Sequence, residues 1–214
     1  MMDAEQLVAR LSAETGTKSR FAPTRTILIG ALAAFAIAVV SSIILLSPRP
    51  DLAASAATPI FLIKIMFAMS VVFGAGIIVR DLSIPGRKPR WWLPLTAAPF
   101  FIIALMAIEQ TVLGHPTGLE HDAKHASLIA CLWQIGLLGL PAFVVISLIV
   151  RSMAPTNLVR TGVYVGLLSG AIGAVGYVFH CSDDYVAFVA LGYTLAMLLM
   201  AGIGGLLGPR ILRW

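Results

Sequence analysis

Long apolar stretches alternate with short polar connections along almost the whole of this chain. Six of the stretches hold about 20 mainly apolar residues each, which is the length that a helix needs to cross the hydrocarbon core of a bilayer. Strands of a membrane β-barrel would instead alternate apolar and polar residues, and these stretches do not. The pattern therefore predicts an all-α polytopic membrane protein, a bundle of six transmembrane helices. The spans lie near residues 26–46, 59–79, 92–113, 126–150, 160–180 and 186–207.

The composition leaves little room for anything besides the bundle. Hydrophobic residues make up 59% of the 214 residues and charged residues 12%, unlike a soluble domain. We therefore expect two units, a cytoplasmic segment at residues 1–25 and a transmembrane domain at residues 26–214. The first span is longer than the apolar core of a signal peptide, which has about 7–15 residues, so we expect it to be retained as an anchor.

The segment ahead of the first span carries an amphipathic pattern. Leu7, Val8 and Leu11 recur at helical spacing, so residues 3–13 are predicted to form a short helix with one apolar face. A helix this short is marginal on its own in water. Its apolar face therefore needs either the membrane surface or a groove on a partner protein.

The basic residues are distributed unevenly between the two sides of the predicted bundle. The positive-inside rule places the richer side, and with it both termini, in the cytoplasm. This arrangement accounts for the net charge of +5 without nucleic acid, and we expect no direct nucleic-acid binding. Twelve of the fifteen Lys and Arg residues lie on that side, namely Arg10, Lys18, Arg20, Arg25, Arg80, Arg87, Lys88, Arg90, Arg151, Arg160, Arg210 and Arg213.

All the thiol and imidazole groups fall near the opposite, outer face. Cys131 lies about one turn inside the fourth span, and His180 and Cys181 close the fifth. Thiolates bind soft metal ions, so a soft cation with His180 or an outer-loop histidine as a further ligand is one possibility. A disulfide between the cysteines is another, because the outer face of a bacterial inner membrane is oxidising. The remaining histidines, His115, His121 and His125, are expected to be mainly solvated loop residues.

Two charged residues lie within the predicted spans. Lys64 is five residues into the second span, and Glu109 lies near the outer end of the third, at a similar depth. Charges inside a membrane seldom go unpaired, so an ion pair between the two is a candidate. The alternative is that the Lys64 side chain extends to the outer interface on its own.

No Walker loop, dinucleotide fingerprint, zincin helix or serine-nucleophile elbow occurs in the chain, and we expect no enzyme. From the residues alone, a binding or sensing protein ranks first. A small transporter of metal or solute ranks second, although only Lys64 and Glu109 offer polar groups for a path. A membrane thiol–disulfide exchanger using Cys131 and Cys181 ranks third.

A series of short motifs, in order along the whole chain, resembles the NrsF family. That family consists of six-span bacterial inner-membrane proteins, negative regulators of the extracytoplasmic-function (ECF) sigma factor called sigma F. The motifs are Arg49-Pro50-Asp51-Leu52, Thr58-Pro59 with Lys64, Ala154-Pro155-Thr156, His180-Cys181 with Asp183-Asp184, Tyr193, Leu207-Gly208-Pro209-Arg210 and Arg213-Trp214.

The resemblance implies a membrane-bound anti-sigma factor of the inner membrane. Its N-terminal segment would hold the sigma factor, and a metal or oxidative stress signal at the periplasmic face would release it. The implied sigma-contact residues are Leu7, Val8 and Leu11, with Arg10 as a polar contact. The implied sensing residues are Cys181 and Cys131.

Overall fold

The computed structural model describes residues 22–84, 92–112 and 128–213. Within these residues all regular structure is helical, and six helices are long and apolar enough to cross a membrane. This confirms the all-α class and the six apolar helices. The long helices are α2 (Ala22–Ser41, continued by the π-helical turn η1, Ser42–Leu46), α4 (Pro59–Ser83), α5 (Trp92–Val112), α7 (Leu128–Arg151), α8 (Leu158–Val178) and α9 (Val186–Ile211), and a short α3 (Leu52–Ser55) precedes α4.

Local signals in the sequence set several helix boundaries. Thr58 caps α4, accepting a hydrogen bond from the backbone N–H of Phe61, and Pro59 occupies the first helical position. At its other end α4 continues to Ser83, one turn beyond the predicted 59–79, because Asp81 and Ser83 keep one side of that turn buried. The helix stops where Ile84 becomes extended, directly before a proline.

Helix α8 forms the centre of the bundle and packs against α9, α7, α4 and α2. It is the most buried span, with 72% of its most apolar stretch inside the protein, whereas the figure for the peripheral α5 is 11%. Glycines allow the closest of these contacts. A Cβ atom at Gly162 would lie 2.2 Å from the carbonyl oxygen of Gly204 on α9, and one at Gly166 would lie 2.1 Å from that of Met200. The two backbones therefore touch directly.

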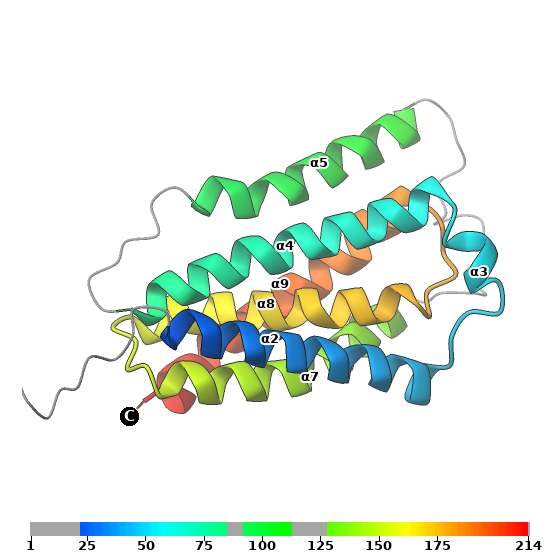
Figure 1. The fold of residues 1–214 in the computed structure, drawn as a ribbon. Helices are drawn as coiled ribbons and strands as arrows, with labels where there is room; N and C mark the ends of the chain where they lie inside the picture. Colours follow the sequence, from blue (N-terminus) through cyan, green and yellow to red (C-terminus); the bar gives the residue numbers. More distant parts are fainter. Residues whose placement is uncertain (1–21, 85–91, 113–127, 214) are drawn as a thin grey trace, which may run out of the picture.

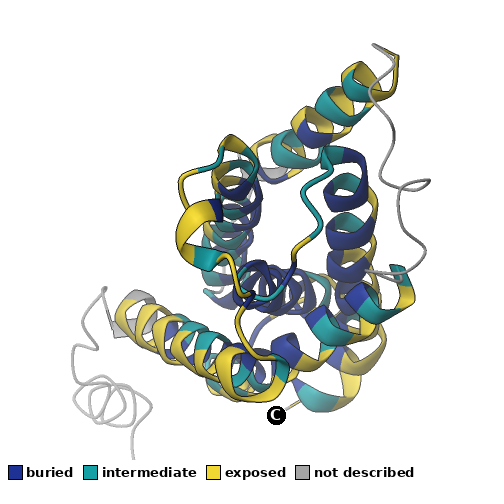
Figure 2. Cartoon of the chain, turned by 90° about the vertical axis from the view of Figure 1, so that its right-hand side faces the viewer, coloured by how far each residue is buried: buried dark blue, intermediate teal, exposed yellow. Residues whose placement is uncertain are grey.

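The outer surface of the bundle is apolar. In Figure 2 the buried residues face the interior, and the exposed residues cover the outside of the helices. Several large apolar side chains on this surface are 67% to 74% exposed, among them Ile44, Met66, Phe101 and Leu206. A surface of this kind suits contact with lipid chains.

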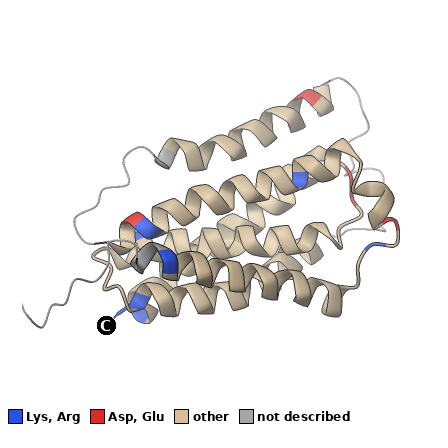
Figure 3. Cartoon of the chain, in the orientation of Figure 1, with Lys and Arg blue, Asp and Glu red and all other residues tan. Residues whose placement is uncertain are grey.

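The two ends of the bundle differ in the charges they carry. One end holds α3 and the connection between α8 and α9, and we call it the α3 end; the other, where α9 finishes, we call the C-terminal end (Figure 1). At the C-terminal end lie the basic residues of the helix termini, including Arg80, Arg151, Arg160 and Arg210 (Figure 3). Arg49 and Lys64 lie toward the α3 end, together with Asp51, Asp183 and Asp184.

Candidate functional site

The connection between η1 and α3 lies across the end of α8. We call this connection, residues 47–51, the strap. The backbone N–H of Arg49 donates to the carbonyl of Phe179 at 3.1 Å, and Nδ1 of His180 lies 2.8 Å from the carbonyl oxygen of Ser47. Ser47 itself has φ of 60°, a left-handed conformation that a side-chain-bearing residue seldom adopts. These bonds tie the end of α2 to the two residues that precede Cys181.

The side chain of Arg49 is the centre of a polar cluster at the α3 end. Its Nε and Nη2 donate to the two carboxylate oxygens of Asp51, each at 2.8 Å. Its Nη1 and Nη2 donate to the two oxygens of Asp184 at 3.2 Å, and Nη1 also donates to the backbone carbonyl of Cys181 at 3.2 Å. The side chain is only 3% exposed, so the guanidinium is buried with its donors engaged.

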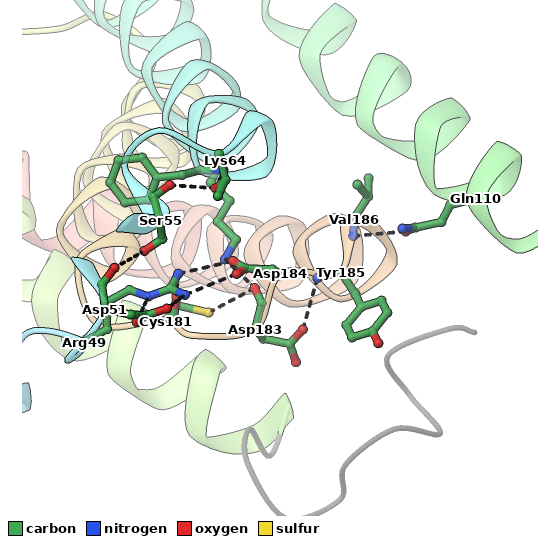
Figure 4. Close-up of polar contacts among 12 residues, drawn as sticks. Arg49, Asp51, Ser55, Lys64, Gln110, Cys181, Asp183, Asp184, Tyr185 and Val186 are labelled. Atoms are coloured by element: carbon green, nitrogen blue, oxygen red, sulfur yellow. Dashed lines mark hydrogen bonds and ion pairs between the residues drawn. The ribbon is translucent and has the colours of Figure 1, made fainter. Parts of the chain in front are cut away.

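Lys64, on α4, reaches the same cluster from the other side (Figure 4). Its ammonium lies 3.0 Å from Oδ1 of Asp184 and also donates to the backbone carbonyl of Asp183. The side chain is fully buried. The ion pair predicted with Glu109 is thus replaced by one with Asp184, because Glu109 is exposed on the peripheral α5 while the α8–α9 connection folds over Lys64.

The cluster sets the charge state of its carboxyl groups. Hydrogen bonds from Arg49 hold the pKa of Asp51 below its usual value. Burial tends to raise the pKa of Asp184, but the hydrogen bonds from Arg49 and Lys64 outweigh it and lower the pKa overall. Burial raises the pKa of Asp183. Arg49 and Lys64 are therefore matched by the ionised Asp51 and Asp184, which a partly buried ion cluster requires.

The two cysteines are buried in the same part of the core, next to this cluster. Cys131 lies in the first turns of α7, and a Cβ atom at Gly192 of α9 would come within 3.1 Å of its sulfur. Cys181 lies in the α8–α9 connection, with its sulfur 3.9 Å from the carbonyl oxygen of Asp183. Both thiols are free, and both belong to the same buried core. Burial raises the pKa of the Cys181 thiol, so it is protonated at rest.

Two tyrosines complete the pocket around the thiols. The rings of Tyr177 on α8 and Tyr193 on α9 lie 5.8 Å apart, and both belong to the same buried core as Cys131 and Cys181. Tyr193 is fully buried, and within the described residues its hydroxyl makes no hydrogen bond. We call the buried cluster of Cys131, Cys181, Tyr177 and Tyr193 the thiol pocket. It places two thiols and two phenol groups together within the apolar core.

The sequence-predicted residues are only partly brought together. Cys131 and Cys181 share the thiol pocket, whereas Nδ1 of His180 is engaged by Ser47. Among residues 22–84, 92–112 and 128–213, no three His, Cys, Asp or Glu side chains are grouped as a metal site. The candidate sigma-contact residues lie outside the described residues, as do three histidines. These are Leu7, Val8, Arg10 and Leu11, with His115, His121 and His125.

Several residues of the site were not assigned a role from the sequence alone. Arg49, Asp51 and Asp184 belong to the quoted motifs, but nothing in their spacing shows that they meet. The one available signal is charge. Arg49 and the aspartates are among the few ionisable residues of the outer connections, and opposite charges that share a membrane face tend to pair. Tyr177 gives no such signal, because an aromatic residue in a span is ordinarily a packing residue.

Comparison with known proteins identifies the family. The NrsF family, described as "Negative regulator of sigma F", matches residues 11–214. The chain belongs to the NrsF family. It is 30% identical over 214 residues to the "Anti-sigma-F factor NrsF" of Caulobacter vibrioides, and 28% identical over 213 residues to the "Probable anti-sigma-F factor NrsF" of Azospira oryzae. Both alignments cover 100% of each chain. No solved structure matches the chain.

Proposed function

We propose that this NrsF-family protein is an anti-sigma factor of the bacterial inner membrane. It holds an ECF sigma factor of the sigma F type with its N-terminal segment and releases it when the thiol pocket meets a soft metal or an oxidant. The observation that carries the proposal is full-length similarity to two proteins named as anti-sigma-F factors. The six apolar helices support a membrane location.

The distribution of charge supports cytoplasmic termini. The start of α2, the end of α4, the α7–α8 connection and the end of α9 all lie at the C-terminal end of the bundle, where the basic side chains gather (Figure 3). Under the positive-inside rule this end faces the cytoplasm. The N-terminal segment then lies on the side where a sigma factor is found. The thiol pocket and the Arg49 cluster lie on the periplasmic side.

The thiol pocket suits the sensing of a soft metal or an oxidant. It offers two free sulfurs, and the Tyr193 hydroxyl is buried in the same cluster. Soft cations prefer thiolates, and binding them displaces the thiol protons. In the resting state the buried, protonated Cys181 stays inert, so only a ligand or oxidant that enters the pocket changes its state.

The strap provides a route from the thiol pocket to the N-terminal segment. The carbonyl of Cys181 is held by the Arg49 side chain, and the carbonyl of Phe179 by the Arg49 backbone. A change at Cys181 would disturb these bonds and with them the strap, which continues directly into η1 and α2. Because a helix transmits displacement along its axis, α2 would carry the shift to its other end, where the N-terminal segment is attached. Lys64 links the α8–α9 connection, which contains Cys181, to α4.

The test is retention of the sigma factor by membranes that contain the full chain. Wild type should retain a co-expressed sigma factor, and Leu7→Asp/Leu11→Asp should lose it, since charges remove the apolar face that docks. Ala9→Asp/Ala13→Asp is the matched control, because it adds the same two charges to the opposite face of the predicted helix. Absence of sigma factor from wild-type membranes would contradict the proposal. Metal accumulation by vesicles would then favour a transporter.

A further inference from the structure

An apolar groove runs along the bundle between α2 and α4, with α8 as its floor. Its volume is about 300 Å³. α2 packs mainly on α7 and α8, so the groove separates it from α4 over much of its length. Its walls are formed by Leu28 and Leu32 of α2 and Phe73 and Ile77 of α4, and its floor by Leu168 and Ile172 of α8.

Among the described residues that line this groove, one side chain is charged: Arg80, at the C-terminal end of α4. Its Nε is buried, and within the described residues it has no hydrogen-bond partner. Arg25, in the first turns of α2, adds an exposed positive charge at the same end of the bundle. A buried Nε–H without an acceptor is costly, so an acceptor that enters the groove beside the half-buried Arg80 would be stabilised there.

We propose that the groove binds an anionic phospholipid of the surrounding membrane. One acyl chain would lie along the apolar walls, and the phosphate would accept hydrogen bonds from Arg80. Two observations favour a lipid over a protein partner. The groove opens between the lipid-facing side chains Leu28, Leu32 and Phe73, each more than half exposed. Arg80 also lies near the end of α4, and the ends of a spanning helix lie at the depth of the lipid headgroups.

Binding of this kind has a consequence for the position of α2. A lipid between α2 and α4 acts as a removable spacer beside the helix that carries the N-terminal segment. Lipid occupancy would therefore bias how α2 sits on α7 and α8, and so the hold on the sigma factor. This consequence rests on the proposed function, whereas lipid binding itself does not.

The test measures binding of phosphatidylglycerol and of phosphatidylcholine with identical acyl chains to the purified full chain in detergent, by native mass spectrometry. Arg80→Gln removes the cation. Gly76→Leu places a side chain in the groove, because Gly76 lines it and a Cβ atom there meets nothing within 4 Å. The controls are Arg160→Gln, a basic residue of the same end outside the groove, and Gly202→Leu, whose Cβ is equally unhindered.

Wild type should bind phosphatidylglycerol more tightly than phosphatidylcholine. Arg80→Gln should weaken phosphatidylglycerol about tenfold, the equivalent of one charge-assisted hydrogen bond, and bring the two lipids level. Gly76→Leu should weaken both lipids, and the two controls should match wild type. Equal binding of the two lipids by wild type would overturn the proposal. So would unchanged phosphatidylglycerol binding by Arg80→Gln or Gly76→Leu. This measurement does not involve the sigma factor. A failure of the sigma-factor retention test would therefore leave the lipid-binding result unchanged.

Discussion

The guanidinium of Arg49 donates a hydrogen bond to the backbone carbonyl of Cys181, 132 residues further along the chain, at 3.2 Å. The same group holds Asp51 and Asp184. The buried Arg49 side chain, which follows the end of α2, therefore contacts both Cys181 and Asp184. Asp184 also pairs with Lys64 of α4. A change at the thiol has a physical route to α2 through this contact.

Loss of the Arg49 side chain should both destabilise the protein and interrupt that route. Arg49→Gln leaves Asp184 with only Lys64 and frees the Cys181 carbonyl, so we expect a loss of about 2 kcal/mol in the free energy of unfolding. For a chain of this size that lowers Tm by roughly 4–8 °C. Thermal unfolding in detergent measures the change. Arg160→Gln, an exposed residue of the opposite end, is the control and should change Tm little.

The pairing of Lys64 with Asp184 predicts coupling between these two residues. Lys64→Met and Asp184→Asn should each destabilise the protein, and the double variant should lose less than the sum of the two by about 1 kcal/mol. Glu109→Gln, at the exposed carboxylate, should leave stability within about 0.5 kcal/mol of wild type. A double-mutant cycle by thermal unfolding checks both points. Additive effects of the two changes would show that the ion pair contributes nothing.

The charge cluster should make stability fall in acid. Asp51 and Asp184 have pKa values lowered in the folded state, so the stability they contribute is complete above their unfolded values, about 4, and is lost as pH falls through the folded values. Asp183, with its pKa raised, contributes the opposite slope. Tm measured from pH 7 down to pH 3 should therefore fall in wild type and fall less in Asp184→Asn. Identical profiles for the two proteins would count against the cluster.

The sequence accounts for the helices of this protein better than for its site. Long apolar runs predict spans directly, because lipid requires every backbone polar group to be bonded within its own helix. The α4 boundaries at Thr58 and Ile84 likewise follow from capping and from a following proline. The partner of Lys64 is different in kind. It depends on how the α8–α9 connection folds over α4, and spacing along the chain carries no information on that. Depth alone suggested Glu109, which the peripheral position of α5 leaves exposed.

For the thiol pocket, the sequence likewise predicts the depth of the residues in the membrane but not their contacts. Positions near the span ends place Cys131 and Cys181 at the same face of the membrane, and the structure puts both in one buried pocket. The surrounding tyrosines come from the close approach of α8 and α9, which depends on glycine contacts between the two helices.

The unpartnered hydroxyl of Tyr193 gives a prediction of its own. Tyr193→Phe removes a buried polar atom that makes no hydrogen bond, so without metal the variant should be as stable as wild type or up to about 1 kcal/mol more stable. If the hydroxyl takes part in ligand binding, the same variant should respond to cadmium at higher concentrations than wild type. Thermal unfolding with and without cadmium measures both effects. A clear loss of stability in the metal-free variant would mean that the hydroxyl has a partner.

The most direct test of the account follows the sigma factor itself when the thiol pocket is challenged. Membranes that hold a co-expressed sigma factor are exposed to cadmium or to a thiol oxidant, and the released sigma factor is quantified for wild type and for Cys131→Ser/Cys181→Ser. Release by wild type, with retention by the serine variant under the same treatment, is the predicted result. Equal release from both proteins would contradict a sensing role for Cys131 and Cys181.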